Sequence, residues 1–142
     1  MIELENVGYS YGGGELLGEV SITLSQGSFH FLTGPSGSGK TTLMKLCYGA
    51  LHATSGQLRA FGKDMRTLDR DDMALMRRKI GVVHQDCRFL DHLPLQENVS
   101  LPLLVSGKDV AQEEINLSEL MQWVGLANRA DALPPELSGG ER

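Results

Sequence analysis

The chain has 142 residues, of which 41% are hydrophobic and 22% charged, the composition of a soluble globular protein of about one domain. A net charge of -5 argues against nucleic acid as the main partner, because binding to a phosphate backbone needs a positive face. Two cysteines without CxxC spacing and four histidines without a ligand pattern predict a reducing compartment and no structural metal. With no apolar run of the ~20 residues that span a bilayer, we expect a cytoplasmic chain unless a partner carries it to a membrane.

The first 30 residues have the pattern of antiparallel β-structure. Residues 2–7 alternate apolar and polar, a run of glycines at 12–14 interrupts them, and Val20, Ile22 and Leu24 alternate again. The next segment, 29–32, is apolar apart from one histidine and predicts a buried strand.

A helix is predicted after the glycine-rich residues 33–41, because Leu43, Leu46 and Cys47 fall on one helical face before Gly49 ends the pattern. Farther on, we expect a short strand at 57–62, a second buried strand at 80–83 and a helix over 109–124, which presents Leu117, Leu120, Met121 and Val124 as an apolar stripe.

Residues 71–79 predict a short helix with acids at its start and bases at its end. Asp71 and Asp72 come first, and Arg77, Arg78 and Lys79 come last, which is the arrangement that the helix dipole favours. We therefore interpret the three basic residues as a helix end and not as a binding patch.

The strongest chemical signal is "GPSGSGKT" at 34–41, which has the spacing of a phosphate-binding loop. Small residues let consecutive backbone N–H groups curl around a polyphosphate, and the following helix points its positive end at the same anion. Lys40 adds a cation at the β- and γ-phosphates, and Thr41 offers a hydroxyl to Mg²⁺. The pattern predicts a site for a nucleoside triphosphate with Mg²⁺.

A second signal is "LSGGE", Leu137 to Glu141. By itself it is an ordinary helix-entry turn, in which Ser138 caps and Glu141 lies three residues on. Together with the phosphate loop about a hundred residues earlier and a glutamine, Gln85, after the apolar segment 80–83, it resembles the signature motif of the ATP-binding-cassette (ABC) ATPases.

The resemblance implies an α/β P-loop fold of ABC type, with residues 1–85 forming a β-region and nucleotide core and 86–142 a helical subdomain. It implies that Tyr11 stacks on adenine, with Tyr9 as the rival, and that Gln85 reaches Mg²⁺ and links the site to a membrane partner. It also implies that the signature residues close over the ATP of a second chain. The predicted ATP-binding residues are Tyr11, Gly34, Pro35, Ser36, Gly37, Ser38, Gly39, Lys40, Thr41, Thr42, Gln85, Ser138, Gly139 and Gly140, with Thr41 and Gln85 at the metal.

Within the family, "FLTGPSGSGKTTL", "RRKIGVVHQD" and "ENVSLPL" look most like the cell-division ATPases, although Ser28 and His84 depart from the usual residues. This implies a homodimer on the inner face of a bacterial membrane, held there by an integral membrane protein and regulating cell-wall cleavage. Lipoprotein-releasing and macrolide-export ATPases are the alternatives within the family.

The family's Asp-Glu strand and its later histidine are not among these 142 residues. We therefore expect the N-terminal portion of an ABC domain, which binds ATP and does not hydrolyse it alone. Two alternatives remain: a compact P-loop kinase for a small molecule, with Asp86 as its Mg²⁺ carboxylate, and a fragment that at most binds nucleotide.

Overall fold

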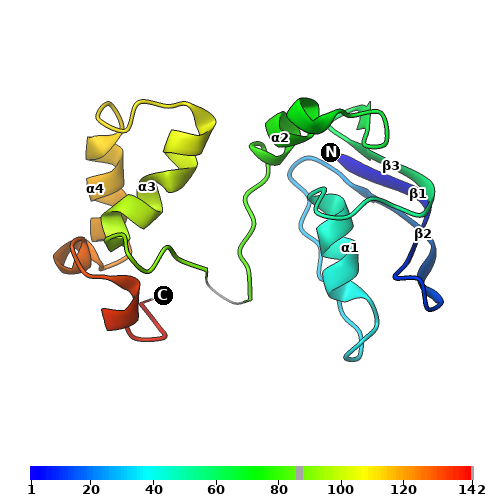
Figure 1. Ribbon diagram of the computed structural model, residues 1–142, viewed down its shortest axis with the longest axis horizontal. Coiled ribbons are helices and arrows are strands. Elements are labelled where there is room, and N and C mark those ends of the chain that lie inside the picture. Colours follow the sequence, from blue (N-terminus) through cyan, green and yellow to red (C-terminus); the bar gives the residue numbers. More distant parts are fainter. Residues whose placement is uncertain (86–87, 142) are drawn as a thin grey trace. The chain divides into compact units, whose positions relative to one another are not determined.

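The computed structural model describes residues 1–85 and 88–141 and divides the chain into two compact units. The N-terminal unit is Met1–Val82, and the C-terminal unit begins at Val83. Figure 1 shows a sheet with two helices in the first unit and helices alone in the second. Each unit is described by itself below.

The N-terminal unit is built on a four-stranded sheet of order β2-β1-β3-β4. Its strands are β1 (Ile2–Ser10), β2 (Glu15–Leu24), β3 (Ser55–Ala60) and β4 (Lys63–Asp64), and every neighbouring pair is antiparallel. The antiparallel region predicted from the first 30 residues is confirmed, and so is the short strand expected near residue 57. The glycine run at 12–14 forms the connection between β1 and β2.

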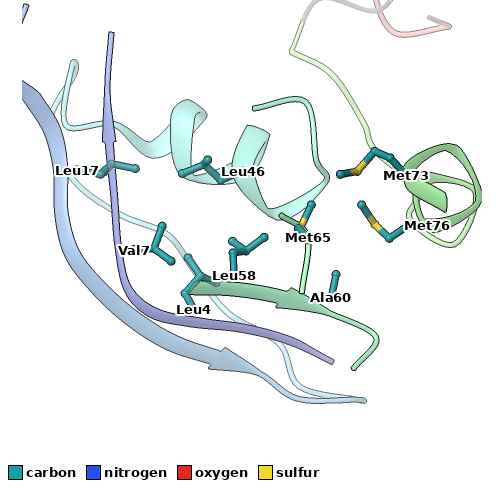
Figure 2. Close-up of a cluster of buried hydrophobic side chains, with 9 residues drawn as sticks. All are labelled: Leu4, Val7, Leu17, Leu46, Leu58, Ala60, Met65, Met73 and Met76. Atoms are coloured by element: carbon teal, nitrogen blue, oxygen red, sulfur yellow. The ribbon is translucent and has the colours of Figure 1, made fainter. Parts of the chain in front are cut away.

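A single apolar cluster joins this sheet to α1 (Lys40–Cys47) and α2 (Arg70–Arg77). Figure 2 shows Leu46 of α1 facing Val7 and Leu58 of the strands. The cluster's buried side chains are Leu4, Val7, Leu17, Leu46, Leu58, Ala60, Met65, Met73 and Met76. Because Leu43 and Cys47 pack against the same cluster, the apolar face predicted for α1 is confirmed, and the helix that follows the phosphate loop is firmly seated.

The end of α1 meets three methionines at Gly49, where φ is 76°. A Cβ at this position would lie 2.7 Å from Met73 Sδ, 2.9 Å from Met76 Cε and 3.0 Å from Met65 Cε. Glycine therefore ends α1 for two reasons, since it adopts the left-handed conformation and leaves room for the packing of α2.

The helix predicted at 71–79 is confirmed as α2, with a side-chain cap at its start. The Asp69 carboxylate accepts the backbone N–H of Asp72 at 2.8 Å, and Arg77 lies in the last turn. Its acidic start and basic end match the helix dipole, as the sequence indicated.

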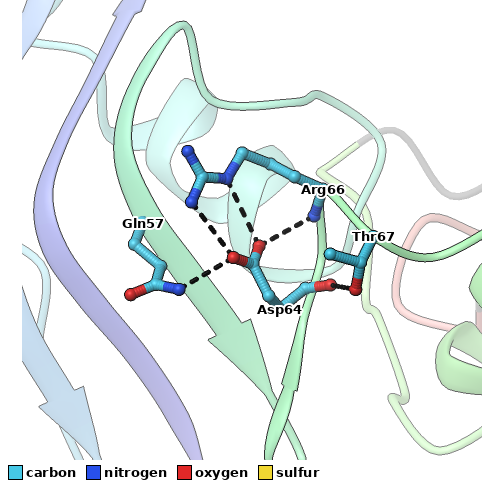
Figure 3. Close-up of polar contacts among 4 residues, drawn as sticks. All are labelled: Gln57, Asp64, Arg66 and Thr67. Atoms are coloured by element: carbon cyan, nitrogen blue, oxygen red, sulfur yellow. Dashed lines mark hydrogen bonds and ion pairs between the residues drawn. The ribbon is translucent and has the colours of Figure 1, made fainter.

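A polar network closes the β3–β4 hairpin (Figure 3). The Asp64 carboxylate accepts hydrogen bonds from Gln57 Nε2 at 2.8 Å and from Arg66, both from its backbone N–H at 3.0 Å and from Nη2 at 3.0 Å. The Thr67 hydroxyl donates to the Asp64 carbonyl at 2.8 Å. The hydrogen bonds from the Arg66 side chain and then from Gln57 hold the pKa of Asp64 well below its usual range.

Two predicted strands are wrong: neither 29–32 nor 80–83 is a strand. Phe29 and Phe31 are 80% and 84% exposed, and Val83 is 96% exposed. The residues that the structure describes contain no strand that pairs with either segment. An apolar run becomes a buried strand only where neighbours accept its hydrogen bonds and cover its faces, so the composition alone misled the prediction.

The C-terminal unit contains α3 (Leu95–Ser106), α4 (Glu114–Trp123) and the short 3₁₀ helices η1 (Ala127–Arg129) and η2 (Pro134–Glu136). Its small core is Leu95, Met121 and Leu137. The carbonyls of Ala130 and Ala132 accept the first backbone N–H groups of α3, which ties the segment after η1 to that helix.

The helix expected over 109–124 is shorter than predicted, because 110–113 form turns. Its apolar stripe is only half buried, since Leu117 and Met121 face the core while Leu120 and Val124 are 43% and 50% exposed. None of the helices in the described part of the chain combines the length and apolar character of a membrane span.

Candidate nucleotide-binding site

The phosphate loop, residues 34–39, leads directly into α1 in the N-terminal unit. Three of its residues, Gly34, Gly37 and Gly39, have φ of 153°, 81° and 86°, a region that favours glycine. A Cβ on Gly39 would lie 2.6 Å from Leu17 Cδ2, so any larger residue would have to displace this side chain of β2. The Gly39 carbonyl accepts the Leu43 N–H at 2.8 Å and so continues into the helix.

Lys40 closes the loop on itself. Its Nζ donates to the carbonyls of Gly34 at 2.8 Å and Pro35 at 2.7 Å, and the Ser38 N–H donates to the same Pro35 carbonyl at 3.3 Å. The ammonium group is therefore held against the loop backbone at the N-terminal end of α1. The positive end of the helix dipole and the charge of Lys40 therefore lie together at the N-terminus of α1, and this concentration of positive charge favours the binding of a polyphosphate.

The two threonines after Lys40 differ in exposure. Thr41 is exposed at the first turn of α1, whereas Thr42 is buried. The Thr42 hydroxyl is 3.3 Å from the hydroxyl of Tyr11, which connects the segment after β1 to the first turn of α1. Of the remaining loop residues, Ser36 is exposed, and a Cβ on Gly37 would meet nothing within 4 Å.

The structure separates the two candidate adenine-stacking residues by exposure. Tyr9 packs partly against the core of the N-terminal unit, while Tyr11 is 62% exposed. Their rings meet edge to face with centroids 4.7 Å apart. The arrangement leaves the ring of Tyr11 available to a planar ligand beside α1 and uses Tyr9 to support it.

Gln85 is exposed and belongs to the C-terminal unit. The phosphate loop belongs to the N-terminal unit, so the role of Gln85 at the metal stays a prediction from the sequence. Asp86, the carboxylate of the kinase alternative, lies outside the described residues.

The signature turn, residues 138–141, also belongs to the C-terminal unit. The Ser138 N–H donates to Glu141 Oε2 at 2.8 Å, and the Glu141 N–H donates to the Ser138 carbonyl at 3.0 Å. Hydrogen bonds from Ser138, first from its side chain and then from its backbone, lower the pKa of Glu141 to about 2, with a smaller contribution from Arg129. The turn thus contains half of a capping box, in which the glutamate caps the N–H of Ser138.

Sequence reasoning missed Arg129, which contacts this turn from η1. Its Nε donates to Glu141 Oε1 at 3.1 Å, and its Nη2 donates to the Glu136 carbonyl at 3.3 Å. A single arginine 12 residues before its partner leaves no periodic signal, so only the folded chain reveals the pair.

The described residues give Gly139 and Gly140 no steric reason to be glycine. Neither has a positive φ, and a Cβ on either would meet nothing within 4 Å. The turn therefore presents two open backbone positions.

Comparison with known proteins matches residues 17–142 to the model of the ABC transporter family. The cell division ATP-binding protein FtsE of Haemophilus influenzae is 39% identical over the whole chain, which covers 66% of that protein. FtsE of Bacillus subtilis is 37% identical over the whole chain, which covers 63% of it. The macrolide export ATP-binding/permease protein MacB of Escherichia coli K12 is 36% identical, and the chain covers 23% of its length.

Solved structures agree with these relatives. A dimeric ATP-binding cassette bound to ADP and phosphate superposes with a TM-score of 0.86 at 30% identity, over 99% of this chain and 65% of that one. The chain therefore spans just under two thirds of the FtsE proteins and of this cassette. The predicted α/β P-loop fold of ABC type is confirmed, and the chain belongs to the ABC transporter family of ATP-binding proteins.

Proposed function

We propose that this chain is the ATP-binding portion of a subunit that drives a membrane complex through changes in conformation. The observation that carries the proposal is the phosphate loop, in which glycines with positive φ and the clasped Lys40 lead into the N-terminus of α1. This arrangement collects backbone N–H groups, a helix dipole and a cation, which together bind the phosphates of a nucleotide.

The residues around the loop fit ATP and Mg²⁺. Tyr11 offers an exposed ring for adenine, and an aromatic stack has no hydrogen-bond pattern with which to distinguish bases, so we expect weak selectivity between ATP and GTP. The exposed Thr41 hydroxyl is a hard oxygen ligand of the kind that Mg²⁺ prefers, with phosphate oxygens and water completing its shell. The resemblance to the family adds the side-chain oxygen of Gln85, from the C-terminal unit, as a second proposed ligand. Mg²⁺ would neutralise charge on the β- and γ-phosphates.

The signature turn contributes to the site of a second chain. Its glycines are not required by conformation or by contacts with the described residues, and two residues without side chains leave the backbone open to the close approach of a ligand. Ser138, Gly139 and Gly140 would close over the γ-phosphate bound by the partner's phosphate loop. The similar cassette of known structure is dimeric, which supports this pairing.

The finer assignment is to a cell-division system. We place the chain with the FtsE proteins, acting with an integral membrane partner of the FtsX type at the inner face of a bacterial membrane to regulate septal cell-wall cleavage. Identities of 39% and 37% to two FtsE proteins support this assignment. At 36% identity, MacB keeps macrolide export as the second candidate. Co-purification with FtsX or with the permease part of MacB would separate the two.

Isothermal titration of the chain with Mg-ATP tests the nucleotide site. Lys40→Ala removes charge-assisted contacts to phosphate worth ~1.5–3 kcal/mol, so the Kd should rise ~10- to 150-fold. Lys45→Ala, in the last turn of the same helix, is the matched control and should bind normally. Ser138→Arg should also bind normally, because the signature turn acts on the ATP of another chain.

Equal affinity of Lys40→Ala and the unaltered chain would remove Lys40 from the site and refute the proposed function. A loss of ATP affinity in Ser138→Arg as large as that in Lys40→Ala would refute the assignment of the signature turn to a second chain.

A further inference from the structure

We infer that Arg129 is a positioning residue that holds the signature turn in its shape from outside the motif. The inference rests on the proposed function, which gives the turn a nucleotide to contact. It assigns a role to a residue in η1 that neither the phosphate loop nor the signature sequence includes.

Arg129 contacts the chain on both sides of the motif's first residues. Its Nη2 donates to the carbonyl of Glu136, just before Leu137, and its Nε donates to the carboxylate of Glu141, at the end of the turn. The two contacts use different nitrogens of one planar guanidinium group. A lysine has a single nitrogen and cannot reproduce this two-point geometry.

The opposite side of the motif is held by apolar packing. Leu137 is 5% exposed and packs with Leu95 and Met121, so the backbone enters the turn at a defined place. Just upstream, Glu136 Oε2 accepts the Leu133 N–H at 2.9 Å and shapes η2. The packing of Leu137 and the hydrogen bonds of Arg129 fix the two ends of the turn. Gly139 and Gly140, between these ends, stay exposed.

Glu141 connects Arg129 to Ser138, the residue that would face the nucleotide. One carboxylate oxygen accepts from Arg129, and the other accepts from the backbone N–H of Ser138. Without the guanidinium group, the carboxylate keeps its bond to Ser138 and loses the contact that fixes its direction. We therefore expect Ser138 to sample more than one orientation, although the core of the unit stays intact.

Amide hydrogen exchange of the ¹⁵N-labelled full chain, followed by NMR, tests this inference. The variants are Arg129→Gln, Arg129→Lys and Arg88→Gln. Arg88 is the matched control because it is an exposed arginine of the same unit and makes no ion pair with any described residue. The amides of Ser138 and Glu141 report on the turn, and the amide of Met121 reports on the core of the unit.

In Arg129→Gln, exchange at Ser138 should accelerate roughly tenfold relative to Arg88→Gln, with Met121 unchanged within about twofold. Arg129→Lys keeps the charge and loses one contact, so it should fall between the two. Unchanged exchange at Ser138 in Arg129→Gln would overturn the inference. Equal acceleration at Ser138 and Met121 would overturn it too, because Arg129 would then only stabilise the unit.

The outcome is separable from that of the proposed function. Arg129→Gln should bind Mg-ATP like the unaltered chain, because the phosphate loop lies in the N-terminal unit. If the unaltered chain binds no ATP, the proposed function fails while the exchange data still decide whether Arg129 holds the turn.

Discussion

The phosphate loop and the signature turn are both built of serine and glycine, yet the chain holds them by different means. In the phosphate loop, Gly34 and Gly39 have positive φ, and a side chain on Gly39 would strike Leu17. In the signature turn, Gly139 and Gly140 have neither constraint. Glycine is thus demanded by the chain's own conformation in the first case and, in our proposal, by an approaching ligand in the second.

The side-chain hydrogen bonds that hold the two turns differ as well. Lys40 holds the phosphate loop through carbonyls five and six residues away, whereas Arg129 holds the signature turn through a carboxylate 12 residues away. Hydrogen bonds between residues close in sequence fall within a short motif and can be predicted from it, whereas a contact across 12 residues cannot. The following predictions test this comparison, from the largest expected effect to the smallest.

In our proposal both turns bind phosphate, and neither supplies the base that deprotonates water. A positioned general base contributes a factor of ~10² to 10⁴, and the Asp-Glu strand that the family uses for this is not among these residues. We predict that the 142-residue chain hydrolyses Mg-ATP at the background rate, measured by phosphate release with Lys40→Ala as the control. Hydrolysis that depends on Lys40 would contradict this, and its loss in Asp86→Asn would favour the compact kinase.

Alanine at the two kinds of glycine should change stability by very different amounts. Gly39→Ala forces a side chain into positive φ and against Leu17, so we expect the free energy of unfolding to fall by ~2–3 kcal/mol. Gly139→Ala meets open space at negative φ and should change it by less than ~1 kcal/mol. Urea unfolding followed by circular dichroism measures both. A cost at Gly139 equal to that at Gly39 would mean that the signature turn is constrained by its own chain after all.

The smallest effect concerns the carboxylate of the β3–β4 hairpin. Because Arg66 and Gln57 hold the pKa of Asp64 below its unfolded value of 3.8, the stability that Asp64 contributes is present above about pH 4. It is lost as the pH falls through the folded pKa. The unaltered chain should therefore exceed Asp64→Asn in stability by less than ~1 kcal/mol at pH 7, and the difference should shrink below pH 4. A difference that stays constant from pH 7 to pH 3 would show that the charge of Asp64 has no part in the network.

Local patterns in the sequence predicted the elements that complete their hydrogen bonds with near neighbours. The β1–β2 hairpin, α1 with Leu46 on its buried face, and the capped α2 are of this kind. Segments 29–32 and 80–83 were mispredicted because an apolar run says nothing about whether a pairing strand is present. Helix α3 was not predicted, since Pro102 interrupts its sequence and much of its surface is apolar without a clear period.

The sequence also predicted residues for the candidate site, but it did not predict the tertiary contacts that hold these residues in place. The spacing of the phosphate loop predicts Lys40 and Thr41 directly, because consecutive residues would form the whole anion-binding loop. The hydrogen bond between the Tyr11 and Thr42 hydroxyls and the contact of Arg129 with Glu141 join residues 31 and 12 positions apart. Such pairs depend on the tertiary fold, which no short motif encodes.

The two bonds from Lys40 to the carbonyls of Gly34 and Pro35 also bear on the heat of nucleotide binding. An ammonium group has three N–H donors, and two of them already bond the loop, so every phosphate contact beyond the first must replace one of these bonds and part of its enthalpy is offset. The same bonds restrict the side chain beforehand, which reduces the entropy lost on association. Binding of Mg-ATP should therefore release less heat than the number of new contacts suggests, at a smaller entropic cost than a freely moving lysine would bring.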